Sequence, residues 1–180
     1  MGGNFGLNLI GTAQLWNFGM LRLRDAMRKI LWVLLLVGIA LNAQPSSPEQ
    51  EVRSAISTFV KALRNLDWPT FLDCWAANPV MFGADGLRID TRAEFESVWR
   101  RGFDRMRADA AARGVTSPPY VPLLPRDVRV DFVGPGVAVV TWHHGPEEAG
   151  IRRRMFVLSK STGAWKITHL HASDVSPAKK

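Results

Sequence analysis

Apolar positions recur with a helical period in the first half of the chain and with a strand period in the second. From Val52 to Leu63 they return every three or four residues, which is typical of a helix that buries one face. Ser47, Pro48 and Gln50 precede this run and supply a cap, an early proline and a capping-box partner. The pattern therefore predicts a first helix that begins near Pro48.

Two more helices and a small hairpin are predicted before the strand period begins. Asp67, with a proline two positions later, predicts a short second helix whose apolar stripe includes Trp75. Thr91 and Glu94 form a capping box for a third helix that ends near Gly114. Between these helices, the segment 79–90 has the pattern of a short hairpin.

Strands dominate the rest of the sequence. The proline-rich segment 117–125 predicts an extended loop, and alternating apolar residues with glycine-containing turns follow it. Helices followed by consecutive antiparallel strands predict an α+β domain with the helices packed on one face of the sheet. The four predicted strands span 128–133, 137–144, 151–160 and 164–172.

The first 45 residues have the pattern of an export signal. A short basic segment, 27–29, precedes the uncharged apolar run 30–41, and small residues then lead to Pro45. We therefore expect an upstream extension at 1–26, a signal peptide at 27–43 and one domain at 44–180, located in the periplasm or secreted. The run is shorter than the roughly 20 residues of a membrane-spanning helix. An uncleaved anchor is the less favoured alternative, and no stable membrane span is expected after cleavage.

Charge and cysteine content narrow the class of protein. The formal net charge is +7, and removal of residues 1–43 takes away four basic residues and one acid, which leaves +4. The remaining basic residues are scattered among acids, so we do not expect a nucleic-acid partner. The single cysteine, Cys74, excludes an internal disulfide and has no cationic neighbour in sequence that would activate it. We interpret it as a packing residue.

Histidines in the last strands are the candidate chemical groups. Period-two geometry predicts that Trp165, Ile167, His169 and His171 share one face. His144 ends a strand two places away and could reach the same rim. Because imidazole titrates near neutrality, His169, His171 and His144 are the candidates for a general base. The alternative interpretation is that they are structural, with partners from the backbone or a neighbouring acid.

The order of elements, together with the terminal pattern from Trp165 to Ser173, resembles the SnoaL-like branch of the nuclear transport factor 2-like superfamily. The resemblance covers about 48–173. It implies a cone-shaped fold in which three N-terminal helices pack on a strongly curved, mostly antiparallel sheet and leave a hollow between them. Members include isomerases, cyclases, hydrolases and binding or assembly modules, and they are commonly dimers through the sheet, so the fold leaves the function open.

The catalytic residues of the ketosteroid isomerase branch have no counterpart in this sequence. By element order, Phe59 stands at the tyrosine position, Gly83 near the aspartate position, and Arg154 or Met155 near the second acid. None of these side chains can perform the corresponding role. Whether the protein is an enzyme therefore stays open.

Metal and anion binding are weaker interpretations. His169 and His171 form a half-site, but a zinc site needs three or four protein ligands. We therefore predict no metal and no cofactor. Arg152 and Arg154 share a strand face and could hold a carboxylate or phosphate, although such a pair is more often a solvated face or a dimer rim.

These observations favour a small, largely apolar ligand in the hollow between helices and sheet. The first alternative is an enzyme of the cyclase, isomerase or hydrolase type that uses His169 or His171 as general base. The second is a non-catalytic dimeric assembly module. The residues expected to line the pocket are Phe59, Trp75, Phe82, Trp99, Phe103, Trp142, His169 and His171.

Overall fold

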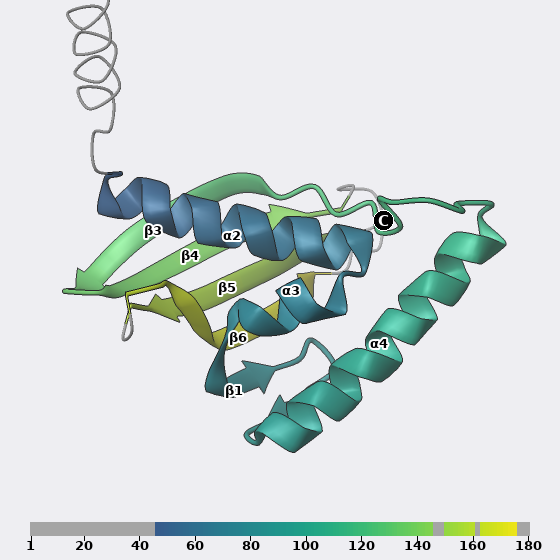
Figure 1. Ribbon diagram of the computed structural model, residues 1–180, viewed down its shortest axis with the longest axis horizontal. Coiled ribbons are helices and arrows are strands. Elements are labelled where there is room, and N and C mark those ends of the chain that lie inside the picture. Colours follow the sequence, from purple (N-terminus) through teal and green to yellow (C-terminus); the bar gives the residue numbers. More distant parts are fainter. Residues whose placement is uncertain (1–45, 146–149, 161–162, 176–180) are drawn as a thin grey trace, which may run out of the picture. The chain divides into compact units, whose positions relative to one another are not determined.

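A computed structural model describes residues 46–145, 150–160 and 163–175. The predicted extension 1–26 and signal peptide 27–43 lie outside the described residues. Figure 1 shows the described elements in order along the chain. They are α2 (Pro48–Asn65), α3 (Trp68–Asp73), β1 (Trp75–Phe82), β2 (Arg88–Ile89), α4 (Arg92–Ala112), β3 (Arg126–Gly134), β4 (Val137–His144), β5 (Ile151–Ser159) and β6 (Lys166–Val175).

The predicted helix starts are confirmed at the level of individual hydrogen bonds. The Ser47 hydroxyl accepts from the Gln50 backbone N–H at 3.2 Å, and the Gln50 side chain accepts from the Ser47 N–H at 2.9 Å. Asp67 caps α3, and Thr91 caps α4 by accepting from the Glu94 N–H at 3.3 Å. Because each cap satisfies a backbone donor that has no intrahelical partner, these sequence signals fix where the helices begin.

Trp75 corrects one predicted boundary. Its spacing after Trp68 suggested the second helix, but α3 ends at Asp73 and Trp75 is the first residue of β1. The Cys74 carbonyl accepts a hydrogen bond from the Ile167 N–H at 2.9 Å, and Trp75 is paired with Ile167. Pairing with a strand some 90 residues later in the chain overrides the local helical pattern, and the Trp75 side chain still enters the core.

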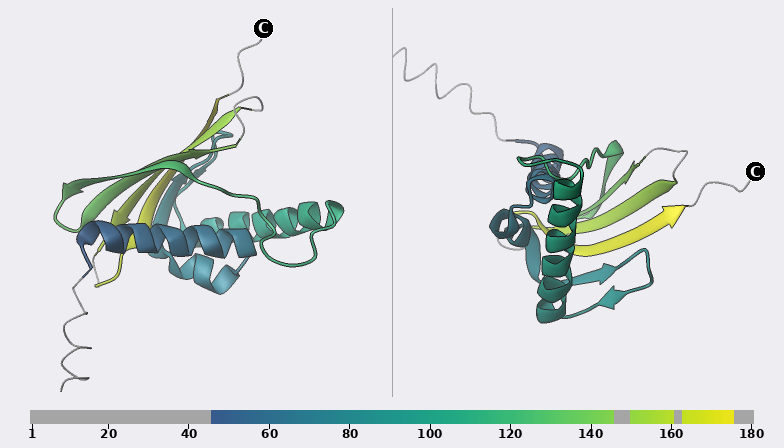
Figure 2. Two further views of the ribbon diagram at one scale, coloured as in Figure 1. Left: turned by 90° about the horizontal axis from the view of Figure 1, so that it is seen from above. Right: turned by 90° about the vertical axis from the view of Figure 1, so that its right-hand side faces the viewer.

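The predicted α+β architecture is confirmed. The six strands form one curved, open sheet in the order β2-β1-β6-β5-β4-β3. All neighbours are antiparallel except β1 and β6, which are parallel. Figures 1 and 2 show the three helices on one side of this sheet, which we call the helix-facing side; the other side is the outer face.

The core lies between the helices and the helix-facing side of the sheet. Directly paired residues of neighbouring strands project to the same side, so the row Val140, Phe156 and Leu170 places three buried side chains under the helices. Phe59 of α2 and Phe71 of α3 pack onto this surface. None of the helices within the described ranges 46–145, 150–160 and 163–175 has the length and apolar character needed to cross a membrane.

Candidate functional site

Five of the six aromatic residues predicted to line a pocket pack against one another in the core. The ring centroid of Phe59 lies 5.8 Å from that of Trp75 and 6.3 Å from that of Trp142. Trp99 and Phe103 complete the cluster around Phe71. Phe82 is different, because it is 41% exposed at the end of β1. Ring-to-ring packing therefore occupies the region where the sequence analysis expected the ligand.

Three indole groups of this cluster lack a hydrogen-bond acceptor. The Nε1 atoms of Trp75, Trp99 and Trp142 are buried, and no acceptor from the described residues reaches them. A buried donor without an acceptor costs about 1–3 kcal/mol. An acceptor oxygen that reached the cluster would offset this cost, so the aromatic core has donors that a ligand carbonyl or a water molecule could satisfy.

A β-bulge in β6 corrects the predicted placement of two histidines. Along β5, Val157 pairs with His169 and the next residue, Leu158, pairs with Ile167, so Thr168 is one extra residue. Ile167 and Leu170 are consequently both buried, whereas His169 and His171 are exposed on the outer face. The prediction that these histidines share a face with Trp165 and Ile167 is wrong. The available signal was the spacing of three between Ile167 and Leu170, two apolar residues that both require burial.

Neither of these imidazoles is arranged as a general base in the hollow. His169 Nδ1 lies 3.0 Å from the Thr168 hydroxyl oxygen, and His171 faces Phe82 across the β1–β6 pair. Within the described part of the chain, no carboxylate lies within hydrogen-bonding distance of either ring. In those same residues, no group of three His, Cys, Asp or Glu side chains is close enough to hold a metal ion.

His144, the third candidate, lies on the helix-facing side within a cluster of charges. The strand register aligns it with Arg152 and Asp174. Asp174 accepts from Arg154 Nη1 at 3.1 Å, and its other oxygen lies 3.9 Å from Arg152 Nε. Burial, followed by the positive charges of Arg154 and Arg152, lowers the pKa of His144 to about 4. His144 is therefore a neutral imidazole near pH 7 and a weak base.

Part of this cluster could be predicted from the sequence. Arg152 and Arg154 lie on one face of β5, as predicted. Asp174 was missed, although the register of the β5–β6 hairpin was the signal that could have placed it opposite Arg152. The cluster thus consists of two guanidinium groups that share one carboxylate beside a neutral imidazole.

An apolar cleft of about 280 Å³ lies between α2 and the strands β3 and β4. Ile56 and Val60 form its helix wall, and Val140 lies in its sheet wall. Arg53 bounds it on the α2 side, where its guanidinium donates to the Val128 carbonyl oxygen at 3.5 Å and pairs with Glu49 at 2.8 Å. The remaining lining residues are Ser57, Pro125, Val128 and Val130.

This cleft exists because β3 is an edge strand. Among the described strands it pairs only with β4, so its valines contact α2 without being fully buried. None of the residues predicted to line the ligand pocket lies in this cleft. Short valine-rich strands look the same at the edge and in the middle of a sheet, and only the strand order distinguishes the two positions.

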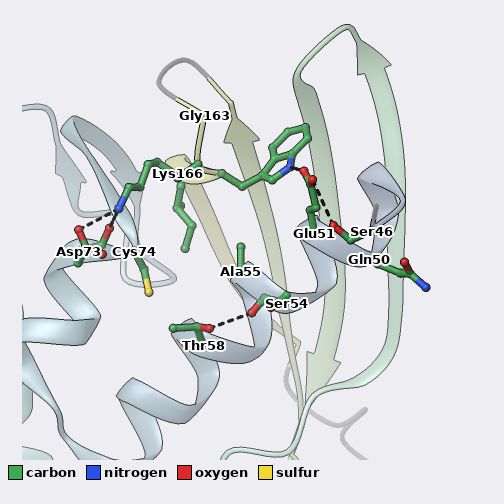
Figure 3. Close-up of a pocket in the computed structure, with 13 residues that line it drawn as sticks. Ser46, Gln50, Glu51, Ser54, Ala55, Thr58, Asp73, Cys74, Gly163 and Lys166 are labelled. Atoms are coloured by element: carbon green, nitrogen blue, oxygen red, sulfur yellow. Dashed lines mark hydrogen bonds and ion pairs between the residues drawn. The ribbon is translucent and has the colours of Figure 1, made fainter. Parts of the chain in front are cut away.

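A second groove, of about 420 Å³, lies between α2 and the start of β6 (Figure 3). Lys166 pairs with Asp73 at 2.9 Å on one side, and Glu51 accepts from Trp165 Nε1 at 3.0 Å on the other. Glu51 also pairs with Lys160, and these donors lower the pKa of its carboxyl group. The charged groups of this groove therefore already have partners within the domain, and they join α2 and α3 to the sheet.

Cys74 in this groove is not an activated nucleophile. Burial, with a smaller contribution from the charge of Asp73, raises the pKa of its thiol to about 11. The thiol donates to the Thr70 carbonyl oxygen at 3.2 Å. Near neutral pH the group is a protonated thiol that packs between α3 and β6, in agreement with its interpretation as a packing residue.

Comparison with known proteins identifies the family. The sequence model of the SnoaL-like domain matches residues 52–178, and this chain belongs to that family. The predicted branch is thereby confirmed. No curated protein sequence is significantly similar to the chain.

Solved structures show the same fold at low sequence identity. An NTF2-like protein of unknown function from Pseudomonas putida KT2440 is 22% identical over 68% of this chain and 83% of its own, with a TM-score of 0.53. A second one, from Shewanella oneidensis MR-1, is 12% identical over 71% of this chain and 100% of its own, with a TM-score of 0.55. A proposed dehydratase of the NTF2-like family from Streptomyces avermitilis is 20% identical over 72% and 99%, with a TM-score of 0.52. At these identities the similarity defines the fold, which is NTF2-like.

Proposed function

We propose that this SnoaL-like domain is exported and binds a small, largely apolar molecule in the cleft between α2, β3 and β4. The observation that carries the proposal is an apolar cleft between helix and sheet whose aliphatic walls include Val60, Val128 and Val130, which are only partly buried. Its volume of about 280 Å³ is close to the roughly 300 Å³ at which ligand pockets in proteins begin. The ligand is therefore small.

The rim of the cleft indicates the polar character of the ligand. The Ser57 hydroxyl and the Arg53 guanidinium are the polar side chains that line it, and both are exposed. An aliphatic or aromatic body would contact Ile56, Val60 and Val130, while one acceptor oxygen would remain at the rim. This arrangement provides affinity through apolar contact and supplies no acid–base pair, so it supports binding rather than catalysis.

A fluorescent apolar probe tests this proposal. N-phenyl-1-naphthylamine should show enhanced fluorescence with the wild-type domain, and Val130→Phe should reduce its binding about tenfold or more because the added ring occupies the cleft. The matched control is Val133→Phe, which changes an exposed valine of the same strand outside the cleft. Equal probe binding by both variants, with equal thermal midpoints, would contradict the proposal.

Export is the second part of the proposal and rests on the basic and apolar pattern of 27–43. The intact mass of the protein purified from its native host should correspond to a chain that begins near Gln44. A mass that includes Met1 would contradict cleavage, and recovery only from the cytoplasmic fraction would contradict export. Either result would leave the ligand cleft untouched, because all of its lining residues follow residue 45.

A homodimer through the outer face of the sheet is a second candidate function. It is favoured because both β6 imidazoles face outward, and because Phe82 and Met155 are exposed there in one row with His171. Apolar side chains on an uncovered sheet face are typical of an interface between chains. Met155→Glu should shift the protein from dimer to monomer in light scattering after size exclusion, whereas a wild-type monomer at all accessible concentrations would contradict it.

A further inference from the structure

A separate pocket of about 490 Å³ lies at one end of the sheet and receives most of its side chains from the outer face. The register brings two rows of side chains together there. One row contains Thr141, Met155 and His171, and the next contains His143, Arg153 and Ser173. These residues project away from the core because the buried residues Trp142 and Phe156 alternate with them. The pocket is therefore independent of the ligand cleft on the helix-facing side.

Hydrogen-bond donors predominate in this pocket. Arg153 contributes a guanidinium group, His171 contributes an imidazole, and Thr141 and Ser173 contribute hydroxyls, while His143 lines the pocket with its Nε2 turned to Asp127. A guanidinium group has only donors, and an imidazole has at least one. Such a set of groups matches a ligand rich in acceptor oxygens.

Among the described residues, one carboxylate lines the pocket, and it already has a partner. Asp127 Oδ2 lies 3.3 Å from His143 Nε2. Asp127 reaches this position through an irregularity in β3, where the register shifts between Arg126 and Arg129 and Asp127 adopts a positive φ of 52°. Its carboxylate can hold the His143 ring in place. Because it is paired with His143, the other donors of the pocket remain available to a ligand.

Arg153 differs from its two neighbours in sequence. Arg152 and Arg154 lie on the helix-facing side and share Asp174, although Arg154 also borders the pocket. Arg153 lies on the outer face, and within the described ranges its guanidinium makes no ion pair and no side-chain hydrogen bond. A positive charge in a concave site with hydroxyl and imidazole donors around it attracts an anion.

We propose that the pocket formed by His143, Arg153 and His171 binds the carboxylate or phosphate group of a small organic anion. Arg153 supplies the charge, the His171 imidazole and the hydroxyls of Thr141 and Ser173 supply directional hydrogen bonds, and Met155 contacts the apolar body of the anion.

Imidazole NMR signals provide the test. Phenyl phosphate, inorganic phosphate and benzoate are titrated separately into the full domain at constant pH and ionic strength, with chloride as the reference ion. The signals of His143 and His171 should shift saturably with at least one oxyanion and not with chloride. His169 is an internal control, because it lies on the same face of β6 but does not line the pocket.

Two arginine variants make the test specific. Arg153→Gln should weaken oxyanion binding about tenfold or more, the size expected for loss of one charge-assisted interaction. Arg129→Gln should leave it unchanged, since Arg129 lies one strand away on the same face and is paired with Asp131 at 2.9 Å. Equal binding by Arg153→Gln and wild type would indicate an adventitious ion only and would overturn the proposal, as would the absence of any oxyanion-specific shift.

Two further measurements exclude trivial explanations. Thermal unfolding of each variant shows whether it folds, and His171→Gln serves as a second pocket variant that should also weaken binding. The oligomeric state is followed in the same samples because the pocket shares Met155 and His171 with the proposed dimer surface. Absence of binding in whichever oligomeric state the protein adopts overturns the proposal.

Discussion

The helix-facing side and the outer face of the sheet carry different kinds of side chains, and β6 shows how one strand supplies both. On the helix-facing side, Ile167 and Leu170 are buried under the helices; on the outer face, His169 and His171 are exposed. The two sets are separated by one extra residue, Thr168. Side chains alternate along a strand, so without Thr168 as an extra residue Ile167 and His169 would lie on the same side. The bulge shifts the alternation by one residue, and His169 and His171 therefore lie on the side opposite Ile167.

The contrast between an apolar helix-facing side and a polar outer face is seen on the other strands as well. The helix-facing side carries the aromatic cluster around Phe59 and the apolar cleft beside β3. The outer face carries the pocket that contains His143 and Arg153. The apolar cleft and the donor-lined pocket thus lie on opposite sides of the same sheet.

Truncation of a large side chain on each side should give the largest contrast. Trp142 is 4% exposed and stacks on Phe156 at a centroid distance of 4.4 Å, so Trp142→Ala should lower the free energy of unfolding by about 3–5 kcal/mol. Met155→Ala on the outer face of β5 should cost less than about 1 kcal/mol in the monomer. Urea unfolding measures both, and similar losses would show that the two faces are equally packed.

Acidification should destabilise the protein through the helix-facing side. The pKa of His144 is lowered from 6.5 to about 4 in the folded protein, so as the pH falls below 6.5 only the unfolded chain takes up the proton. His144 therefore imposes no penalty well above pH 6.5, a penalty that increases as the pH falls from about 6.5 to about 4, and no further increase below that. Because the ring is only half-buried, we expect a loss on the order of 1 kcal/mol at about pH 5.

His144→Gln isolates this contribution. Its side chain is neutral throughout the range, so the stability difference between wild type and variant should change between about pH 7 and pH 5 by that amount. His171→Gln on the outer face is the matched control. If the free energy of unfolding depended on pH in the same way for wild type and His144→Gln, His144 would not be the source of the acid destabilisation.

The bulge itself should have the smallest effect. The Thr168 hydroxyl donates to the Val157 carbonyl oxygen at 3.1 Å and contacts His169 Nδ1 at 3.0 Å, so Thr168→Val removes both contacts at nearly constant shape and should cost about 1 kcal/mol. Thr141→Val on the outer face is the control and should leave the unfolding midpoint nearly unchanged. If both substitutions have the same effect, the hydroxyl of Thr168 does not stabilise the bulge.

The elements of this fold could be predicted because local chemistry determines them. Ser47 and Thr91 mark helix starts whose caps are seen in the structure, and Val137 to His144 forms the strand that its alternation predicts. Trp75 was misassigned because its strand depends on a partner far along the chain. Local signals identify caps and periods, whereas pairing across the sheet is a property of the whole domain.

The candidate sites could be predicted less well because they depend on strand order and on the bulge. Arg152 and Arg154 were placed on one face correctly, since alternation within a strand is local. The position of His171 required knowledge of the extra residue in β6, and the valines of the cleft required knowledge that β3 lies at the edge. Phe59 and Trp142 were identified as interior residues, but whether large rings enclose space or fill it depends on their packing.

The parallel pairing of β1 with β6 has a consequence for biosynthesis. β6, which follows the other described strands in the chain, occupies the middle of the sheet, between β1 and β5. Until it emerges from the ribosome, the β1–β2 hairpin and the β3–β4–β5 meander have no strand to connect them, and the helices lack the buried side chains Ile167 and Leu170 of β6. Long-range pairing of this kind slows folding. We therefore expect nascent chains that stop before Lys166 to remain accessible to proteases and chaperones, and the domain to become compact only after its synthesis is complete.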